Sequence, residues 1–395
     1  MNILILTSDL GGGHIRATEA INEHLKLKNP NYNIKILNTI DYINPSFNKL
    51  ITSIYTECVK KYPSLFGKMY YYAEEEHVPI NMFSLILKSL SKKLLPIISN
   101  FKTDVIISTH PFSTEMVSYL KNDGKIKNTK LINLLTDYAP HKFWIHRHVD
   151  AYITATEQMT EDMIKRGVNK NIIYPIGIPV RPIFLNSYER KDVLNSIGFN
   201  EDSFTILLMS GSFGVDHVLK IFKILVNLNK ELQIIIITGN NNYLYHKFEH
   251  LIANNKNKSI KFHLIKYTDN VSKYMKICDV LVTKPGGLTT TEAIFSQLPI
   301  IFFDAYPGQE EKNADFILKN KIGMRISDSE ENINSFIELI ENRQILNKMK
   351  ENILSIQKQN FIDNLIKIID TLKSNEIKKS NYKENNKNKE AISIS

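Results

Sequence analysis

Continuous apolar runs alternate with longer amphipathic segments along the first half of the chain. The runs are bounded by turn residues and are rich in Ile and Leu, which is typical of strands buried on both faces of a parallel sheet. The segments between most of them are long enough for the crossover helices that parallel strands require. Strands are predicted at 2–7, 33–38, 104–109, 130–135, 151–156 and 171–177.

The second half of the chain repeats this scheme after a proline-containing joint. Pro179 and Pro182, within 176–184, disfavour regular structure and stiffen a connector. Two doubly wound domains in tandem place a ligand cleft at the carboxyl ends of both sets of strands. We therefore predict an α/β fold of two Rossmann-like domains that face a central cleft. The strands predicted for the second domain are 204–210, 232–239, 260–265, 279–283 and 298–303.

We expect four segments along the chain. An amino-terminal domain occupies 1–180 and a carboxyl-terminal domain occupies 181–356. A helix over 357–372 is expected to pack back toward the amino-terminal domain. Residues 373–395 are rich in Lys and Asn and poor in apolar residues, which predicts a disordered basic tail.

The chain is basic, with a formal net charge of +9 over 395 residues. This charge favours anionic partners, and acidic lipid explains it better than nucleic acid because no recognised nucleic-acid motif is present. Cys58 and Cys278 stand in no metal or redox spacing, which favours a reducing compartment and a cytoplasmic location. No apolar run approaches the roughly 18–20 residues that span a bilayer, so membrane contact is expected only at the surface.

The stretch "TSDLGGGH" (7–14) joins a predicted strand to a predicted helix through three glycines. Backbone N–H groups in such a turn face an anion or a closely approaching ligand. The spacing differs from both the dinucleotide fingerprint and the phosphate loop, since the third glycine and the lysine are missing. His14 can accept a proton at neutral pH, or it can simply cap the local backbone.

The stretch "TKPGGLTTTEA" (283–293) makes a second strand–turn–helix junction, followed by "PGQEE" (307–311) at the start of another helix. Glycine N–H groups, threonine hydroxyls and a helix N-terminus together suit a diphosphate. Glu292 lies one turn further and can accept hydrogen bonds from a ribose, or can form a capping box with Thr289. Gln309 and Glu310 offer an amide and a carboxylate to sugar hydroxyls.

These motifs resemble those of the monogalactosyldiacylglycerol synthases and the bacterial processive diacylglycerol β-glucosyltransferases. "GGGH", "KPGGLTTTEA" and "PGQEEKNA" carry the resemblance, and the stretches 135–159 and 175–184 are similar to the bacterial branch. The resemblance covers most of residues 1–370. It implies the two-domain GT-B fold and an inverting glycosyltransferase, related to the peptidoglycan transferase that makes lipid II.

The resemblance implies a UDP-sugar held mainly by the carboxyl-terminal domain. The diphosphate is expected at Gly286, Gly287, Thr289 and Thr290, the ribose at Glu292, the hexose at Gln309 and Glu310, and the uracil near Tyr267. Gly12 and Gly13 are expected to form a tight wall beside the donor sugar. Ser212 and Phe213 lie in another strand-to-helix glycine turn, "MSGSFG", which is either a ligand contact or a structural turn.

Inversion requires a base for the acceptor hydroxyl and stabilisation of the departing nucleoside diphosphate. We favour His14 as the base, while Asp137 acts as base, orients His14 or caps the next segment. The chain contains no Asp-x-Asp motif, so we predict no obligatory metal and no cofactor besides the UDP-sugar co-substrate.

The acceptor is expected on the amino-terminal domain, where aromatic residues and lysines are interleaved as at a membrane interface. The amphipathic stretch 81–102 is expected to pack on its own sheet or to contribute to this interface. Trp144 and Arg147 form a second basic-aromatic cluster for anionic phospholipid, and His110 ends a strand at the cleft or simply makes a turn. The candidate acceptor residues are Tyr62, Phe66, Tyr70, Tyr71, His110, Trp144 and Arg147.

The resemblance therefore implies transfer of a hexose, with glucose favoured over galactose, from a UDP-sugar to the sn-3 hydroxyl of 1,2-diacylglycerol. The enzyme is expected on the inner face of the cell membrane as a peripheral protein. A lipid II-forming N-acetylglucosaminyltransferase, a nucleotide-sugar epimerase and a non-catalytic UDP-sugar-sensing adaptor remain as alternatives. The motifs decide neither the hexose nor the number of sugars added.

Overall fold

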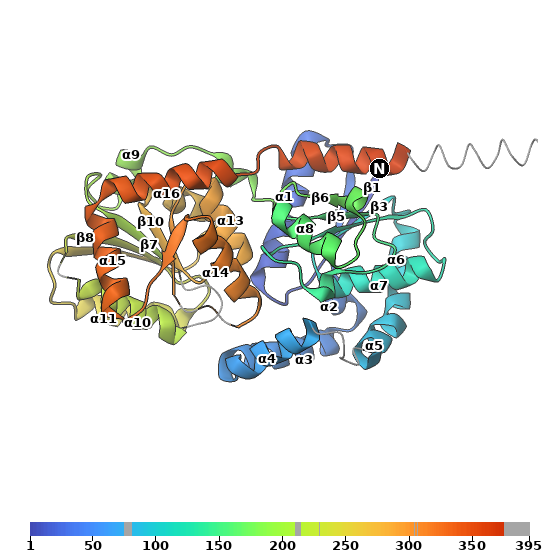
Figure 1. Ribbon diagram of the computed structural model, residues 1–395, viewed down its shortest axis with the longest axis horizontal. Helices are drawn as coiled ribbons and strands as arrows, with labels where there is room; N and C mark the ends of the chain where they lie inside the picture. Colours follow the sequence, from blue (N-terminus) through green and yellow to red (C-terminus); the bar gives the residue numbers. More distant parts are fainter. Residues whose placement is uncertain (75–80, 210–214, 229, 304, 306, 375–395) are drawn as a thin grey trace, which may run out of the picture.

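The computed structural model describes residues 1–74, 81–209, 215–228, 230–303, 305 and 307–374. Two parallel sheets, each six-stranded, form two α/β domains that lie side by side (Figure 1). The strand orders are β2-β1-β3-β4-β5-β6 and β12-β11-β10-β7-β8-β9. This arrangement confirms the predicted fold class.

The amino-terminal sheet forms where the continuous apolar runs predicted it. Its strands are β1 (Asn2–Thr7), β2 (Asn33–Asn38), β3 (Val105–Ser108), β4 (Lys130–Leu134), β5 (Ala151–Ile153) and β6 (Ile173–Tyr174). Its helices are α1 (Gly12–Lys28), α2 (Thr39–Ile43), α3 (Pro45–Lys61), α4 (Pro63–Glu74), α5 (Asn81–Ser91), α6 (Leu95–Asn100), α7 (Pro111–Asn122) and α8 (Glu157–Lys165). Between β2 and β3 the chain makes a long helical excursion, α2 to α6, at one edge of the domain (Figure 1).

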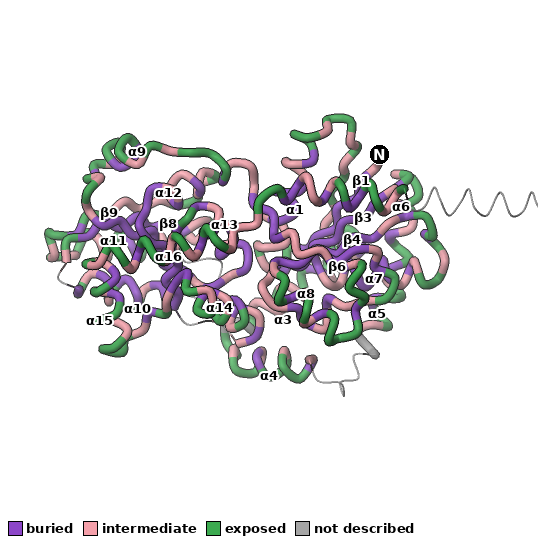
Figure 2. The backbone as a smooth tube through the Cα atoms, turned by 45° about the horizontal axis from the view of Figure 1, so that its top comes forward, coloured by how far each residue is buried: buried purple, intermediate pink, exposed green. Residues whose placement is uncertain are grey.

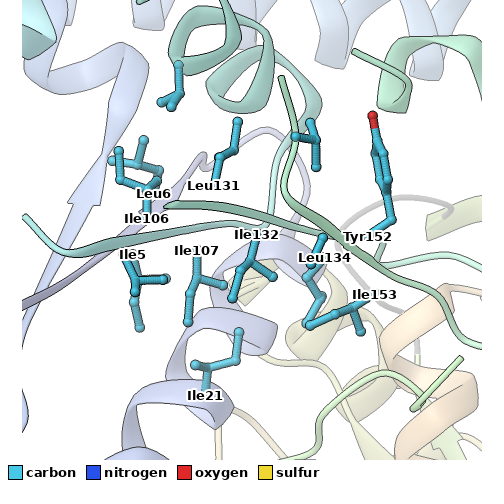
Figure 3. Packing of buried hydrophobic residues seen from close by; sticks show 14 of the residues in the cluster. Ile5, Leu6, Ile21, Ile106, Ile107, Leu131, Ile132, Leu134, Tyr152 and Ile153 are labelled. Carbon is cyan, nitrogen blue, oxygen red and sulfur yellow. The ribbon is translucent and has the colours of Figure 1, made fainter. Parts of the chain in front are cut away.

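The core of this domain is built from both faces of the sheet. Ile5 and Ile107 from neighbouring strands are fully buried and point toward Ile21 of α1 (Figure 3). Burial of such side chains on both faces stabilises the sheet by roughly 1.5–3 kcal/mol each. It also explains why these strands have no polar alternation in the sequence.

The carboxyl-terminal sheet contains the strands predicted for it and one more. Its strands are β7 (Thr205–Met209), β8 (Leu232–Ile237), β9 (Ile260–Ile265), β10 (Val280–Thr283), β11 (Ile300–Phe302) and β12 (Gly323–Arg325). Its helices are α9 (Arg190–Ser196), α10 (Val215–Val226), α11 (Asn242–Ala253), α12 (Val271–Ile277), α13 (Gly287–Phe295), α14 (Gln309–Lys319), α15 (Glu330–Glu341) and α16 (Arg343–Ile356). The edge strand β12 was not predicted, because its residues Gly-Met-Arg form no apolar run.

After α16 the chain returns to the first domain. A helix over residues 361–374 lies along the amino-terminal domain (Figure 1), with Leu365 and Ile369 buried in its core. Ion pairs join Asp363 to Lys28 at 2.7 Å and Lys373 to Asp104 at 2.9 Å. The chain therefore crosses between the two domains twice, which limits how far they separate.

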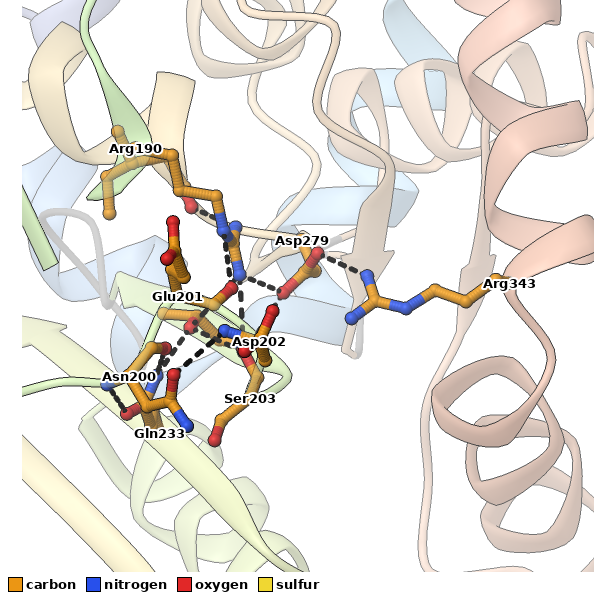
Figure 4. Close-up of polar contacts among 10 residues, drawn as sticks. Arg190, Asn200, Glu201, Asp202, Ser203, Gln233, Asp279 and Arg343 are labelled. Atoms are coloured by element: carbon orange, nitrogen blue, oxygen red, sulfur yellow. Dashed lines mark hydrogen bonds and ion pairs between the residues drawn. The ribbon is translucent and has the colours of Figure 1, made fainter.

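A buried carboxylate organises the carboxyl-terminal domain on the side away from the cleft. Asp279, just before β10, is 3% exposed and accepts hydrogen bonds from the backbone N–H of Thr205 at 2.7 Å, Arg190 at 2.9 Å and Arg343 at 2.8 Å. Figure 4 shows this carboxylate between the two guanidinium groups. It thereby ties β7, α9 and α16 to the start of β10.

Replacing Asp279 with Ala is expected to lower the free energy of unfolding by about 3–5 kcal/mol, because a buried N–H and two cations lose their acceptor. Arg343→Gln is the matched control. It removes one half-exposed partner and is expected to cost about 1 kcal/mol or less. Urea titration at neutral pH measures both values, and equal losses for the two variants would contradict this account of the network.

Candidate active site

A cavity of about 480 Å³ lies between the two domains, at the carboxyl ends of both sheets. Its walls include the turn after β1, the loop after β4, the turn after β10 and the first turn of α14. The N-termini of α1, α13 and α14 all reach this cavity, and their unpaired backbone N–H groups give it a positive potential. The cavity is therefore suited to an anionic ligand.

His14 stands in the first turn of α1, beside the glycine turn. Gly11 precedes the helix with φ of 85°, a left-handed conformation that favours glycine. The Nδ1 atom of His14 lies 3.1 Å from the Thr136 hydroxyl, and its ring meets the rings of His110 at 4.7 Å and Trp144 at 6.0 Å. Burial lowers the pKa of His14 to about 4, so the imidazole is neutral at physiological pH.

Asp137 follows β4 and lines the same cavity. Burial raises the pKa of its carboxyl to about 6, while a 3.1 Å hydrogen bond from the Asn313 amide opposes that rise. The carboxyl is therefore mostly ionised at pH 7 and can accept a proton. Because Thr136 contacts His14 and is adjacent to Asp137 in the chain, the loop after β4 carries one candidate base and holds the other by a hydrogen bond.

The opposite wall is the turn between β10 and α13. Gly287 touches the loop of the other domain so closely that a Cβ atom there would lie 2.2 Å from the Thr136 carbonyl oxygen. Lys284 in the same turn makes a 2.6 Å ion pair with Glu310 at the start of α14. This wall therefore offers backbone N–H groups and an ammonium group together.

Glu292 lies within α13 and lines the cavity. Burial raises the pKa of its carboxyl to about 7, whereas the nearby cations Arg16 and Arg181 oppose the rise. The alternative interpretation of this residue as half of a capping box with Thr289 is wrong, because α13 begins at Gly287 and Thr289 is already inside the helix. Glu292 thus remains available to a ligand.

Many of the residues predicted for the donor come together here. Tyr267 stands beside the cavity, where its hydroxyl contacts Arg16 at 3.5 Å and donates to Asp269 at 2.6 Å. Thr290 is buried outside the lining, and its hydroxyl has no hydrogen-bond partner among the described residues. Ser212 and Phe213 lie outside the described residues. The predicted residues that line the cavity are Gly12, Gly13, His14, Phe66, Asp137, Gly286, Gly287, Thr289, Glu292, Gln309 and Glu310.

The aromatic residues of α4 reach the donor side of the cleft. The Tyr70 ring covers Gly308, just before α14, and would touch any Cβ placed there. The Tyr71 hydroxyl donates to Glu311 at 2.5 Å. Tyr62, at the end of α3, is instead 59% exposed. The helical excursion of the first domain is therefore in direct contact with the helix that carries Gln309 and Glu310.

The predicted basic-aromatic surface cluster of Trp144 and Arg147 does not form. Trp144 is 5% exposed and packs in the core behind His14, while Arg147 is exposed and its carbonyl accepts a hydrogen bond from Ser118. His110 is also buried, and its Nδ1 accepts from the backbone N–H of Phe112 at 3.3 Å. Both rings support His14 rather than reaching a membrane surface.

Several residues that line the cavity were not predicted as site residues. Lys284 stands inside the quoted stretch 283–293, two residues before Gly286, and Arg16 stands two residues after His14. Asn313 stands four residues after Gln309, on the same face of α14, and that spacing was a usable signal. Arg181 comes from the proline-containing connector, where the sequence carried no signal.

No group of three or more His, Cys, Asp or Glu side chains stands close enough to hold a metal ion among the residues with described positions. Within the same part of the chain, every helix is too short or too polar to cross a bilayer.

Two family models match successive parts of the chain. Residues 14–180 match the monogalactosyldiacylglycerol (MGDG) synthases, and residues 194–355 match the glycosyl transferases group 1. The processive diacylglycerol beta-glucosyltransferase of Bacillus licheniformis is 28% identical over 363 residues, which cover 91% of this chain and 92% of that protein.

Solved structures share the fold at low sequence identity. MurG of Acinetobacter baumannii matches with a TM-score of 0.61 and 13% identity, over 94% of this chain and 99% of that one. HepE of Anabaena, crystallised with UDP-glucose, matches with a TM-score of 0.54 and 14% identity, over 96% of this chain and 100% of that one. These likenesses confirm the two-domain architecture.

Proposed function

Because this chain belongs to the family of monogalactosyldiacylglycerol synthases and processive diacylglycerol β-glucosyltransferases, we propose that it transfers a hexose from a UDP-sugar to diacylglycerol. The observation that carries the proposal is the interdomain cavity, which brings His14 and Asp137 opposite the turn at Gly286 and the start of α14. One wall offers two bases, and the other offers groups suited to a diphosphate and a sugar. Glucose is the hexose we propose, as in the names of the curated relatives.

The carboxyl-terminal wall is proposed to bind the donor. The diphosphate lies at the N-terminus of α13, where Gly286 and Gly287 expose backbone N–H groups and Lys284 adds positive charge. Glu292 accepts from the ribose, and Gln309 with Glu310 contacts the hexose. These groups stabilise the UDP anion as it leaves, so we propose that the reaction has no obligatory metal.

The amino-terminal wall is proposed to supply the base. His14 or Asp137 takes the proton from the sn-3 hydroxyl of diacylglycerol, whose oxygen attacks the anomeric carbon as the bond to UDP breaks. Attack from the face opposite the leaving group inverts the anomeric centre. The Thr136 hydroxyl, 3.1 Å from His14, holds the imidazole ring in place.

Helices α3 to α5 of the helical excursion are proposed to rest on the anionic inner face of the cell membrane. Figure 2 shows α4 with many exposed positions at the edge of the molecule. Exposed lysines at 49, 61 and 68 stand among the exposed apolar side chains of these helices, a combination typical of interfacial helices. The buried Leu87 and Leu94 of the stretch 81–102 pack instead on their own domain. The exposed apolar side chains of this region include Leu50, Ile54, Tyr62, Leu65, Met69, Tyr72, Leu85 and Ile86.

Replacing both Leu65 and Met69 with Ser is expected to weaken binding to anionic vesicles by about tenfold or more, because each apolar side chain buried in the interface contributes roughly 1.5–3 kcal/mol. Sedimentation with vesicles of phosphatidylglycerol and diacylglycerol measures the binding. Leu354→Ser, at an equally exposed position on α16, is the control and is expected to bind as the unaltered chain does. Equal binding by all three proteins would contradict the proposed membrane face.

The function is tested with purified protein and labelled UDP-glucose, UDP-galactose or UDP-N-acetylglucosamine, each offered with diacylglycerol in anionic liposomes. The expected product is labelled glycosyldiacylglycerol from UDP-glucose, formed equally with and without EDTA. No labelled lipid from any donor would refute the transferase proposal. Labelled lipid that disappears with EDTA would refute only the metal-independent mechanism.

A further inference from the structure

Asn313 of α14 joins the two domains at the loop that carries Asp137 and the Thr136 partner of His14. Its Nδ2 donates to Asp137 Oδ1 at 3.1 Å, and its Oδ1 accepts from the backbone N–H of Tyr138 at 2.9 Å. The residue is 0% exposed. Because the backbone N–H requires an acceptor, the orientation of the amide is determined, and its NH₂ group faces the carboxylate.

Further contacts that cross the cleft hold the same loop. The Tyr138 hydroxyl lies 2.9 Å from Thr291 Oγ1 of α13, and the Tyr138 ring stacks on Phe316 of α14 with centroids 3.9 Å apart. Gly287 adjoins the Thr136 carbonyl. The loop 136–138 is thus wedged between α13 and α14 of the opposite domain.

We propose that Asn313 is a positioning residue, which holds the loop 136–138 from the donor-binding domain and so places both Asp137 and the Thr136 partner of His14. This inference rests on the proposed function and deepens it, since the base then reaches its working position only when the two domains are docked. It applies whichever of the two candidates takes the proton.

A neutral donor suits this position because Asp137 is surrounded by charge of both signs. The amide stabilises the ionised carboxylate without adding a charge that would compete with the pair of Lys284 and Glu310. The ionisable groups that interact with Asp137 come from α3, α4, its own loop, the β10–α13 turn and α14: Tyr55, Tyr70, Tyr138, Lys284 and Glu310.

The hydrogen bond between Asn313 and Asp137 is tested first by a measurement that does not depend on enzyme activity, the thermal unfolding of the full chain from pH 5 to 8. Asn313→Asp keeps the acceptor for Tyr138 and removes the donor. Its unfolding temperature is expected to fall further below that of the unaltered chain as pH rises through about 6, where Asp137 ionises, because two carboxylates then face each other. Asn313→Ala replaces the Asp variant if that variant does not fold. Its unfolding temperature is expected to fall in the same direction with rising pH, but by a smaller amount.

The exchange variant Asn313→Asp with Asp137→Asn restores one donor and one acceptor. It is expected to recover most of the stability lost at pH 8. Tyr138→Phe is the matched control, because it removes another contact of the same loop. Burial raises the pKa of Tyr138, so its hydroxyl stays neutral and the loss is the same at every pH tested. A pH-independent loss for Asn313→Asp, with no recovery in the exchange variant, would overturn the inference.

Activity measurements distinguish a positioning role of Asn313 from a role in binding the donor. Asn313→Ala is expected to lower kcat by about 10²-fold, the effect of an ångström-scale misplacement of a reacting group. The Kd for UDP-glucose, measured by calorimetry, is expected to change by less than about threefold. A Kd that rises as much as kcat falls would make Asn313 a donor contact instead. If the unaltered chain makes no glycolipid, the proposed function fails, while the unfolding experiment still decides the bond.

Discussion

Replacing His14 with Ala or Asp137 with Asn is expected to identify the base. Loss of the residue that acts as the base is expected to lower kcat by about 10²- to 10⁴-fold. The pH dependence of kcat/KM in the unaltered chain gives an independent answer. A base must be unprotonated, so activity is retained above its pKa and lost as pH falls through it. The profile therefore falls near pH 4 if His14 is the base and near pH 6 if Asp137 is the base.

The control for this experiment is His24→Ala, on the same helix as His14 but outside the cavity lining. Its Nε2 lies 2.8 Å from the Val180 carbonyl oxygen at the domain connector. We expect its kcat within about threefold of the unaltered value. Full activity of both His14→Ala and Asp137→Asn would contradict the assignment of a base to this wall of the cavity.

Gly287→Ala is expected to lower kcat by about 10²-fold, because the new methyl group forces the two domains apart. Its Cβ would lie 2.2 Å from the Thr136 carbonyl oxygen and 2.9 Å from Asp137 Oδ1, against an ordinary contact of 3.4 Å or more. Relief requires a movement of the loop by about 1 Å, and that displaces the candidate bases from the donor. Steady-state kinetics with UDP-glucose and diacylglycerol measure the loss.

The neighbouring Gly286→Ala is the matched variant for the unliganded protein. A Cβ at Gly286 meets only the Thr289 hydroxyl, at 4.0 Å. Its unfolding temperature is therefore expected to stay near that of the unaltered chain, whereas overpacking at Gly287 costs about 1–3 kcal/mol. Equal unfolding temperatures together with unchanged kcat for Gly287→Ala would refute the close contact between the domains.

Local pattern predicted most strands because burial on both faces leaves a continuous apolar run. The edge strand β12 was not predicted because its residues Gly-Met-Arg form no such run, and only its pairing with β11 defines it. Trp144 was wrongly predicted to lie at the surface. Beside basic residues it suggested a surface ring, yet packing behind His14 buries it. The residue type allowed both outcomes, and the surrounding strands and helices selected one.

The sequence by itself determined the two α/β domains and the cleft-facing turns at Gly11–His14 and Gly286–Gly287, because strand ends and glycine turns are local features. Only the tertiary structure decided which groups meet across the cleft. Asn313 bonds to Asp137 across 176 positions of the chain, and Tyr138 bonds to Thr291 across 153. Such pairs depend on how two domains dock, which is a property of surfaces assembled from distant segments. The pKa values of His14 and Asp137 likewise arise from burial in the folded structure.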